Sequence, residues 1–362
     1  MFVAWRDLRF AKGRFALMGA VVLLITLLVG LLSGLTSGLA RENVSAVTAL
    51  PATHLSFAAP AGGQKVSFTN SQLTESAWRT WRTRPGVRSA EPLAIRTANA
   101  VAGERTAAVS VFGVDPAGRL APGGAGPGPG RVVLTEKAAR ELGGPGVGAR
   151  LRVGPLELTV AAVSGTAAFS HTPVVWTDLG DWQRIGNPGG DGGGTVATVV
   201  ALDAPGADLA AGDRAAGTRT ETIDGALGAI GSYTSENGSL QLMRGFLFAI
   251  SALVIGAFFT VWTIQRSGDI AVLKALGAST GYLLRDALGQ AVVMLAAGTG
   301  LGTALAAGFG VLISGGEVPF VLDAATVLVP AAVMIVLGAL GAALSIRRIT
   351  AVDPLTALGS AR

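Results

Sequence analysis

The sequence predicts an α-helical integral membrane protein with four transmembrane helices and a large extracellular α+β domain inserted between helices 1 and 2. Three observations predict this fold class. Four long runs carry no charged residue, the basic residues of the short segments flanking them gather on one side, and the remaining long segment is charged and rich in strand patterns. Only 14% of the 362 residues are charged, whereas soluble domains carry about 25%.

The uncharged runs are residues 15–39, 245–265, 287–316 and 324–346. A helix rises about 1.5 Å per residue, so roughly 20 apolar residues cross a hydrocarbon core of about 30 Å. We therefore predict transmembrane helices over 15–39, 244–265, 287–314 and 324–346. A cleaved signal peptide is the alternative for the first run, but a signal core has only about 7 to 15 residues.

Charge placement predicts the orientation. Basic residues lie before the first span, between the second and third, and after the fourth: Arg6, Arg9, Lys12, Arg14, Arg266, Lys274, Arg285, Arg347, Arg348 and Arg362. The loop 315–323 contains Glu317 and Asp323 and no cation. By the positive-inside rule, both termini and the loop 266–286 are cytoplasmic, and residues 40–243 and 315–323 are outside. We expect a multi-pass protein of the plasma membrane.

The net charge of +5 belongs to the membrane part, since residues 41–243 contain equal numbers of basic and acidic residues. Basic residues beside spans are topology signals and contacts with anionic lipid. The charge therefore predicts the lipid bilayer, and no nucleic acid, as a partner.

The extracellular segment, residues 40–243, has the texture of a mixed domain. Its strand-like runs are "AAVSVFGVD", "LTVAAVSG", "TPVVWTD" and "TVATVVALD", each bounded by Gly, Pro, Asp or Ser. Two segments, "TNSQLTESAWRTWRTRPG" and "LTEKAARELGG", have the cap and stop residues of helices. We predict an α+β domain divided into a strand-rich lobe and a helical lobe.

Several chemistries find no support in the sequence. There is no cysteine, which excludes disulfides and thiol chemistry. The two histidines, His54 and His171, are far apart in sequence, and a lone histidine is more often a surface or hydrogen-bonded residue than a ligand. No lysine stands in a GxxxxGK motif followed by Ser or Thr. We expect no catalytic site, no structural metal and no intrinsic cofactor, and we expect ATP to be hydrolysed by a separate ATPase on the cytoplasmic side.

Three cytoplasmic segments flank the spans. Residues 1–14 mix aromatic and basic residues like a helix lying in the headgroup region, and residues 347–362 form a short tail. The loop 266–286 contains a short amphipathic pattern suited to pass force from a soluble partner to the adjoining spans; a plain interfacial helix is the alternative. The predicted ATPase-coupling residues are Asp269, Ile270, Leu273, Lys274, Leu276 and Gly277.

Three membrane-flanking motifs carry a family resemblance. "WRDLRFAKGRF", "RSGDIAVLKALGAS" and "RRITAVDPLTAL" resemble the permeases of the FtsX/MacB-like ABC transporter superfamily. The resemblance implies a homodimer in which each chain binds an ATPase subunit and exports an amphiphile. An alternative within the superfamily is a force-transmitting scaffold that activates an extracellular cell-wall hydrolase.

The stretch "GSYTSENGSLQLMRGF" predicts the substrate site. If a helix starts early in it, Tyr233, Glu236 and Met243 share one face, which places a carboxylate and a phenol above an apolar wall. Ferric haem suits such a face because it takes oxygen or imidazole donors, apolar walls and a cation, here Arg244, near its propionates. The stretch also resembles haem-efflux permeases of the HrtB type from Gram-positive bacteria. We therefore expect haem as the transported substrate, with Glu236 as a candidate iron ligand.

Two alternatives bear on these membrane-side predictions. The sequence "ENG" is also a turn signal. The alternative is therefore that the helix begins only at Ser239 and leaves Glu236 in an exposed loop. Gly30, Gly34 and Gly38 have the four-residue spacing that permits close helix approach, which predicts a homodimer seam. Glycine is common in membrane helices, which is the alternative explanation of that spacing.

Overall fold

The computed structural model describes residues 12–123, 126–187, 195–265, 268, 272, 276–313 and 318–350. The chain forms two compact units. The membrane unit comprises Met1–Gly38 and Ser239–Arg362, and the outer domain comprises Leu39–Gly238. The predicted interfacial helix (1–14) and tail (347–362) lie almost entirely outside the described residues.

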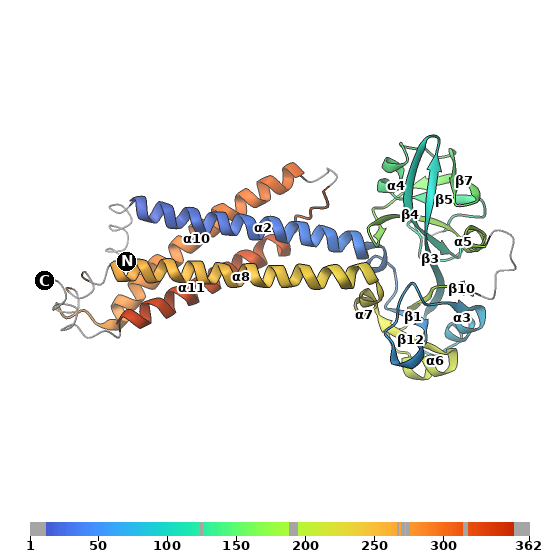
Figure 1. The fold of residues 1–362 in the computed structure, drawn as a ribbon. Helices are drawn as coiled ribbons and strands as arrows, with labels where there is room; N and C mark the ends of the chain where they lie inside the picture. The colour runs from blue at the N-terminus through green and yellow to red at the C-terminus, as the bar shows by residue number, and fades with distance from the viewer. Residues whose placement is uncertain are drawn as a thin grey trace. The chain divides into compact units, whose positions relative to one another are not determined.

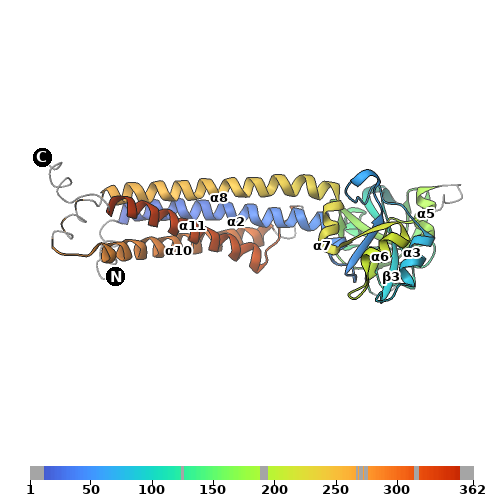
Figure 2. The same cartoon turned by 90° about the horizontal axis from the view of Figure 1, so that it is seen from below.

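Among the described residues there are four long helices: α2 (Lys12–Thr48), α8 (Gly231–Gln265), α10 (Thr280–Ile313) and α11 (Ala324–Thr350). Each is long and apolar enough to cross a membrane. They run side by side in both views (Figures 1 and 2). Helices α2 and α8 continue past the predicted spans, so that residues 39–48 and 231–238 are helical and belong to the outer domain.

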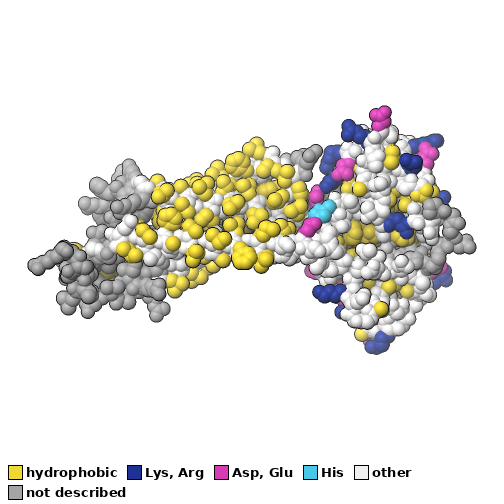
Figure 3. Space-filling model, viewed as in Figure 1, with side chains coloured by type: hydrophobic (Ala, Val, Ile, Leu, Met, Phe, Trp, Pro, Cys, Tyr) yellow, Lys and Arg dark blue, Asp and Glu magenta, His cyan; other side chains and the backbone are white. Residues whose placement is uncertain are grey.

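The core of the membrane unit takes side chains from all four helices. It includes Met18 and Val22 of α2, Phe259 of α8, Leu295 of α10 and Met334 of α11. Buried hydroxyls along α8 are satisfied within the helix, as where Thr263 Oγ1 donates to the Phe259 carbonyl at 2.6 Å. Hydrophobic side chains cover the described surface of these helices in Figure 3, as lipid contact requires.

The three glycines of α2 pack against their own chain. A Cβ at Gly30 would lie 2.8 Å from Ala306 Cβ, and one at Gly34 would lie 2.2 Å from the Phe320 ring. At Gly38 it would meet the Pro319 carbonyl oxygen at 2.0 Å. Helix α10 and the segment before α11 thus occupy the face that the missing side chains leave open. The dimer seam at these glycines stays a prediction.

The described residues of the outer domain contain twelve strands, and their pairing defines two lobes. In chain order its elements are β1 (His54–Ala58), the 3-10 turn η1 (Ala61–Gly63), β2 (Leu73–Thr74), α3 (Glu75–Arg82), β3 (Ser89–Ala102), β4 (Arg105–Val114), β5 (Arg131–Leu134), α4 (Glu136–Glu141), β6 (Arg150–Val153), β7 (Leu156–Val163), β8 (Ala168–Phe169), β9 (Thr172–Asp178), α5 (Leu179–Gly186), β10 (Thr195–Ala197), β11 (Val199–Asp203), α6 (Leu209–Ala216), β12 (Thr218–Thr222), α7 (Ile223–Ala226) and the 3-10 turn η2 (Leu227–Ala229).

The first lobe is a four-stranded antiparallel sheet in the order β12-β1-β11-β3, with α3 and α6 packed together against it. Its chain order, strand-helix-strand twice, is that of the split βαβ motif. Trp81 of α3 is fully buried, and its indole nitrogen donates to Thr218 Oγ1 at 3.1 Å. Gly212 of α6 makes room for that ring, since a Cβ there would lie 2.2 Å from it.

The second lobe is a closed ring of six strands, β3-β4-β9-β5-β7-β6, in which β6 returns to pair with β3 at Ala100 and Val101. Closure leaves no free edge within the ring, and apolar side chains such as Leu134 and Leu158 fill it. Strand β3 belongs to both lobes, because Ser89–Leu93 pair with β11 and Leu93–Ala102 pair with β4. The predicted α+β class is confirmed, although the helical lobe also holds four strands.

Candidate functional site

Helix α8 begins at Gly231, so Glu236 is helical and the alternative turn at "ENG" is wrong. Tyr233 is half-buried and packs against the apolar core of the outer domain. Met243 and Arg244 belong to the membrane unit, where Met243 is exposed and Arg244 Nε has no hydrogen-bond partner among the described residues. Of the four predicted contact residues, Glu236 is the one around which further polar side chains gather.

The Glu236 carboxylate accepts hydrogen bonds from two side chains that are distant in sequence. His171 Nε2 lies 2.8 Å from Oε2 and 2.9 Å from Oε1, and Asn43 Nδ2 donates to Oε2 at 3.0 Å. Asn43 Nδ2 also lies 2.9 Å from His171 Nε2, so the three side chains contact one another. The side chains of His171 and Glu236 are 31% and 41% exposed, so a ligand can reach both.

His171 is held in place by a tight hairpin. It follows Ser170 in the two-residue connection between β8 and β9, and both residues have positive φ, 49° for Ser170 and 66° for His171. Right-handed strand twist favours such turns, but non-glycine residues in this region cost about 1–2 kcal/mol each. Backbone bonds offset this cost: Ser170 N donates to the Asn43 carbonyl at 3.0 Å and His171 N to the Glu42 carbonyl at 3.2 Å.

Asn43 is oriented by a chain of hydroxyls. Ser232 Oγ donates to Asn43 Oδ1 at 2.6 Å, and Ser170 Oγ lies 2.8 Å from Ser232 Oγ. Because the amide oxygen is engaged by Ser232, the amide nitrogen points to Glu236. The end of α2, the β8–β9 turn and the start of α8 are thus joined by side chains in one polar cluster.

A second acidic residue stands behind His171. Glu42 Oε2 lies 3.9 Å from His171 Nδ1, and Glu42 Oε1 forms an ion pair with Lys137 Nζ. The imidazole therefore has a carboxylate near each nitrogen. We call Asn43, His171, Glu236, Glu42 and Lys137 the Glu236 cluster.

The cluster offers an oxygen and a nitrogen donor side by side. In the described part of the chain, no group of three or more His, Asp, Glu or Cys side chains that could hold a metal ion is found. The arrangement is suited to contact a ligand whose metal already has most of its coordination positions filled.

Sequence reasoning identified Glu236 but missed His171, Asn43, Glu42 and Lys137 as its neighbours. His171 and Glu236 are separated by 65 positions, and no local pattern pairs residues at that distance. The available signal was "AFSHTPVVW", in which two polar residues connect apolar runs, as a hairpin turn does.

The predicted coupling segment is described only in part. Leu276 is 79% exposed, and its N–H donates to the Val272 carbonyl at 3.0 Å. Gly277 follows with φ of +93°, the left-handed conformation in which helices commonly end. Asp269, Ile270, Leu273 and Lys274 lie outside the described residues. The role of all six residues stays a prediction.

Comparison with protein families identifies the architecture. Residues 18–218 match the MacB-like periplasmic core domain, and residues 242–354 match the FtsX-like permease C-terminal domain. The first of these matches covers more than half of the chain. The chain belongs to the FtsX/MacB-like family of ABC transporter permeases.

Curated relatives of this FtsX/MacB-like permease are distant. A protein named "Putative hemin transport system permease protein HrtB" from Staphylococcus epidermidis is 28% identical over 208 residues, 55% of each chain. The protein of that name from Staphylococcus haemolyticus is 37% identical over 36% of this chain and 37% of its own. An uncharacterised ABC transporter permease of Mycobacterium tuberculosis is 26% identical over 76% of each chain. The chain thus spans about half the length, or less, of the hemin-transport relatives it matches.

Solved structures include two resembling domains. The extracellular domain of the noncanonic ABC-type transporter YknZ from Gram-positive bacteria is 14% identical, with a TM-score of 0.34 over 47% of this chain and 98% of its own. The periplasmic region of MacB from Actinobacillus actinomycetemcomitans is 13% identical, with a TM-score of 0.35 over 51% of this chain and 94% of its own.

Proposed function

We propose that this chain is the permease subunit of an ABC-type efflux transporter that works as a homodimer and exports haem partitioned into the membrane. Both termini face the cytoplasm, where each chain binds an ATPase subunit that supplies ATP hydrolysis. The outer domain and the loop before α11 face outward.

The observation that carries the haem proposal is the Glu236 carboxylate, held by His171 at 2.8 Å and still 41% exposed. The iron of ferric haem has four porphyrin nitrogens and takes one or two further ligands, for which protein imidazole, thiolate, thioether and phenolate groups serve. In this proposal the Glu236 carboxylate supplies one oxygen donor to the iron. The curated hemin-transport relatives support the same substrate.

The residues around Glu236 have different roles in this proposal. A carboxylate has about four lone-pair sites, so Glu236 can keep the bonds from His171 and Asn43 while one oxygen turns to the iron. His171 and Asn43 are positioning residues in this proposal. Met243, which is exposed, and Arg244 belong to the membrane unit and remain predicted substrate contacts.

Transport follows from movement of the spans. ATP binding draws the two ATPase subunits together, the cytoplasmic segment 266–286 shifts with them, and the helices that it joins move. Haem held at the outer leaflet is then released outward. Energy from ATP is thus used to change which side of the dimer is open, without chemical change in the substrate.

Haem titration tests this proposal. The purified full chain in detergent is titrated with hemin and the Soret band is followed. We expect a saturable shift for the wild type and its loss in Glu236→Ala, because the donor oxygen is removed. Glu157→Ala is the matched control, since Glu157 is an exposed strand residue of the outer domain. A Soret band that does not change in the wild type, or changes equally in Glu236→Ala, would rule out haem binding at Glu236.

A further inference from the structure

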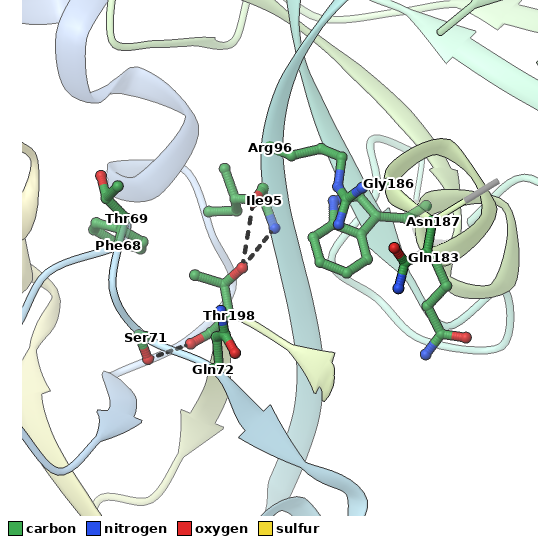
Figure 4. A pocket seen from close by; sticks show the side chains of 11 residues that line it. Phe68, Thr69, Ser71, Gln72, Ile95, Arg96, Gln183, Gly186, Asn187 and Thr198 are labelled. Atoms are coloured by element: carbon green, nitrogen blue, oxygen red, sulfur yellow. Dashed lines mark hydrogen bonds between the residues drawn. The ribbon is translucent and has the colours of Figure 1, made fainter. Parts of the chain in front are cut away.

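The outer domain has a cavity of about 450 Å³ between its two lobes. The first lobe contributes Phe68, Ser71 and Thr198, and helix α5 of the six-stranded lobe contributes Trp182 and Gly186. Arg96 extends between them from β3, three residues after Leu93, where the pairing with β11 ends (Figure 4). Cavities of this size between lobes are the usual location of small-molecule sites.

The Arg96 guanidinium lies flat on an aromatic ring. Its Cζ atom is 3.8 Å from the centre of the Trp182 ring, which is close for a cation–π contact. The chain makes room for this placement at Gly186, where a Cβ would lie 1.1 Å from Arg96 Nη1. Any larger residue at that position would push the guanidinium away from the ring. Both contacts come from α5, which holds the cation in the wall of the cavity.

No described acidic residue balances the charge of Arg96. Among the described residues that line the cavity, none is acidic, and Arg96 makes no ion pair with any described carboxylate. Arg96 Nε and Trp182 Nε1 are both buried without a hydrogen-bond partner in the described structure. Burial lowers the pKa of Arg96 below its ordinary value, since desolvation disfavours the charged form. A buried polar group without a partner costs about 1–3 kcal/mol, and more if charged.

We propose that this cavity binds a small organic anion through a carboxylate that pairs with Arg96. A guanidinium fixed in one plane presents parallel N–H donors that match the two oxygens of a carboxylate. The rings of Phe68 and Trp182, with Ile95, give the body of such a ligand apolar contacts. The polar lining suits an anion with a short aromatic or aliphatic body better than a purely apolar molecule. This site is independent of the haem proposal.

Benzoate binding to the purified full chain in detergent tests the proposal, with calorimetry as the measurement. Benzamide, which has the same ring and no charge, is the ligand control, and inorganic phosphate distinguishes a general anion site. We expect benzoate to bind at least about tenfold more tightly than benzamide, as a charge-assisted pair requires. Phosphate binding as tight as that of benzoate would contradict a carboxylate site with apolar walls.

Two variants locate the binding. Arg96→Gln is expected to weaken benzoate binding about tenfold or more, because it removes the charge and the paired donors. Arg219→Gln is the matched control, since Arg219 is an exposed outer-domain arginine that pairs with Glu221. We expect it to bind benzoate like the wild type. Equal affinity in the wild type and Arg96→Gln, or equal loss in both variants, would overturn the proposal.

Two further variants separate geometry from charge. Gly186→Ala keeps Arg96 but places a Cβ where its guanidinium lies, so we expect loss of benzoate binding in a chain whose circular dichroism is unchanged. If Gly186→Ala does not fold, Arg96→Lys tests the same point, because it keeps the charge without the paired donors. Full binding in Arg96→Lys would contradict the proposal.

Discussion

Glu236 is held by side chains from two distant segments of the chain, the end of α2 and the β8–β9 turn. The helical spacing of Tyr233, Glu236 and Met243 is local and was predicted from the sequence. The hydrogen bonds to His171 and Asn43 depend on the β8–β9 turn and the end of α2, and such contacts follow from the tertiary fold alone. Tyr233 lies on the predicted helical face, but its side chain packs against the apolar core of the outer domain.

Asn43→Ala tests the cluster as a stabilising network. The change removes the donor to Glu236 and the acceptor for Ser232. Because Asn43 is buried and its partners Glu236 and Ser232 are half-exposed, we expect a loss of about 1 kcal/mol in the stability of the outer domain. Thermal unfolding monitored by circular dichroism measures it. Asn99→Ala is the control, since Asn99 is exposed on β3; equal destabilisation in both variants would contradict the network.

At the element scale, composition located the four membrane helices but not their ends. The uncharged runs mark where lipid contact excludes charge, whereas the helical hydrogen-bond ladder of α2 and α8 continues into polar sequence. The same holds for the glycines of α2, whose spacing indicates close packing but not its partner. The packing of α2 identifies Pro319 and Phe320 as residues that these glycines contact.

Gly238→Ala tests whether α8 is continuous through "ENG". A Cβ at Gly238 meets open space, and alanine has a higher helix propensity than glycine. We expect stabilisation by about 0.5–1 kcal/mol, read from the midpoint of thermal unfolding. Destabilisation would show that Gly238 needs a backbone conformation reserved for glycine, as in a turn.

Gly38→Ala tests the packing of α2 within the membrane unit. The new methyl group would lie 2.0 Å from the Pro319 carbonyl oxygen, and backbone cannot move aside as a flexible side chain does. We expect destabilisation of about 1–3 kcal/mol in detergent. Gly19→Ala, on the same helix with open space around it, should be neutral or stabilising. A neutral effect of Gly38→Ala would contradict this packing and would favour the α2 glycines as a contact surface for a second protomer.

On the scale of the whole molecule, the order of one span, a large domain and three spans was predicted, and the family matches cover the same two regions. The pairing of the twelve strands was not predicted. Strand β3 joins two lobes, and the six-stranded lobe is inserted between β3 and β11. Pairings between residues far apart in sequence have no local signal. For the same reason the Arg96 cavity, which needs both lobes, could be found only in the structure.

Haem export is the central claim, and transport measures it directly. The full chain is reconstituted with its ATPase subunit in vesicles loaded with hemin, and apomyoglobin outside reports released haem through its Soret band. We expect ATP-dependent transfer by the wild type and by Glu157→Ala, and a rate at least about tenfold lower for Glu236→Ala, as loss of a ligand contact of about 1.4 kcal/mol or more implies. Transfer that is independent of ATP, or equally fast in Glu236→Ala, would contradict the account.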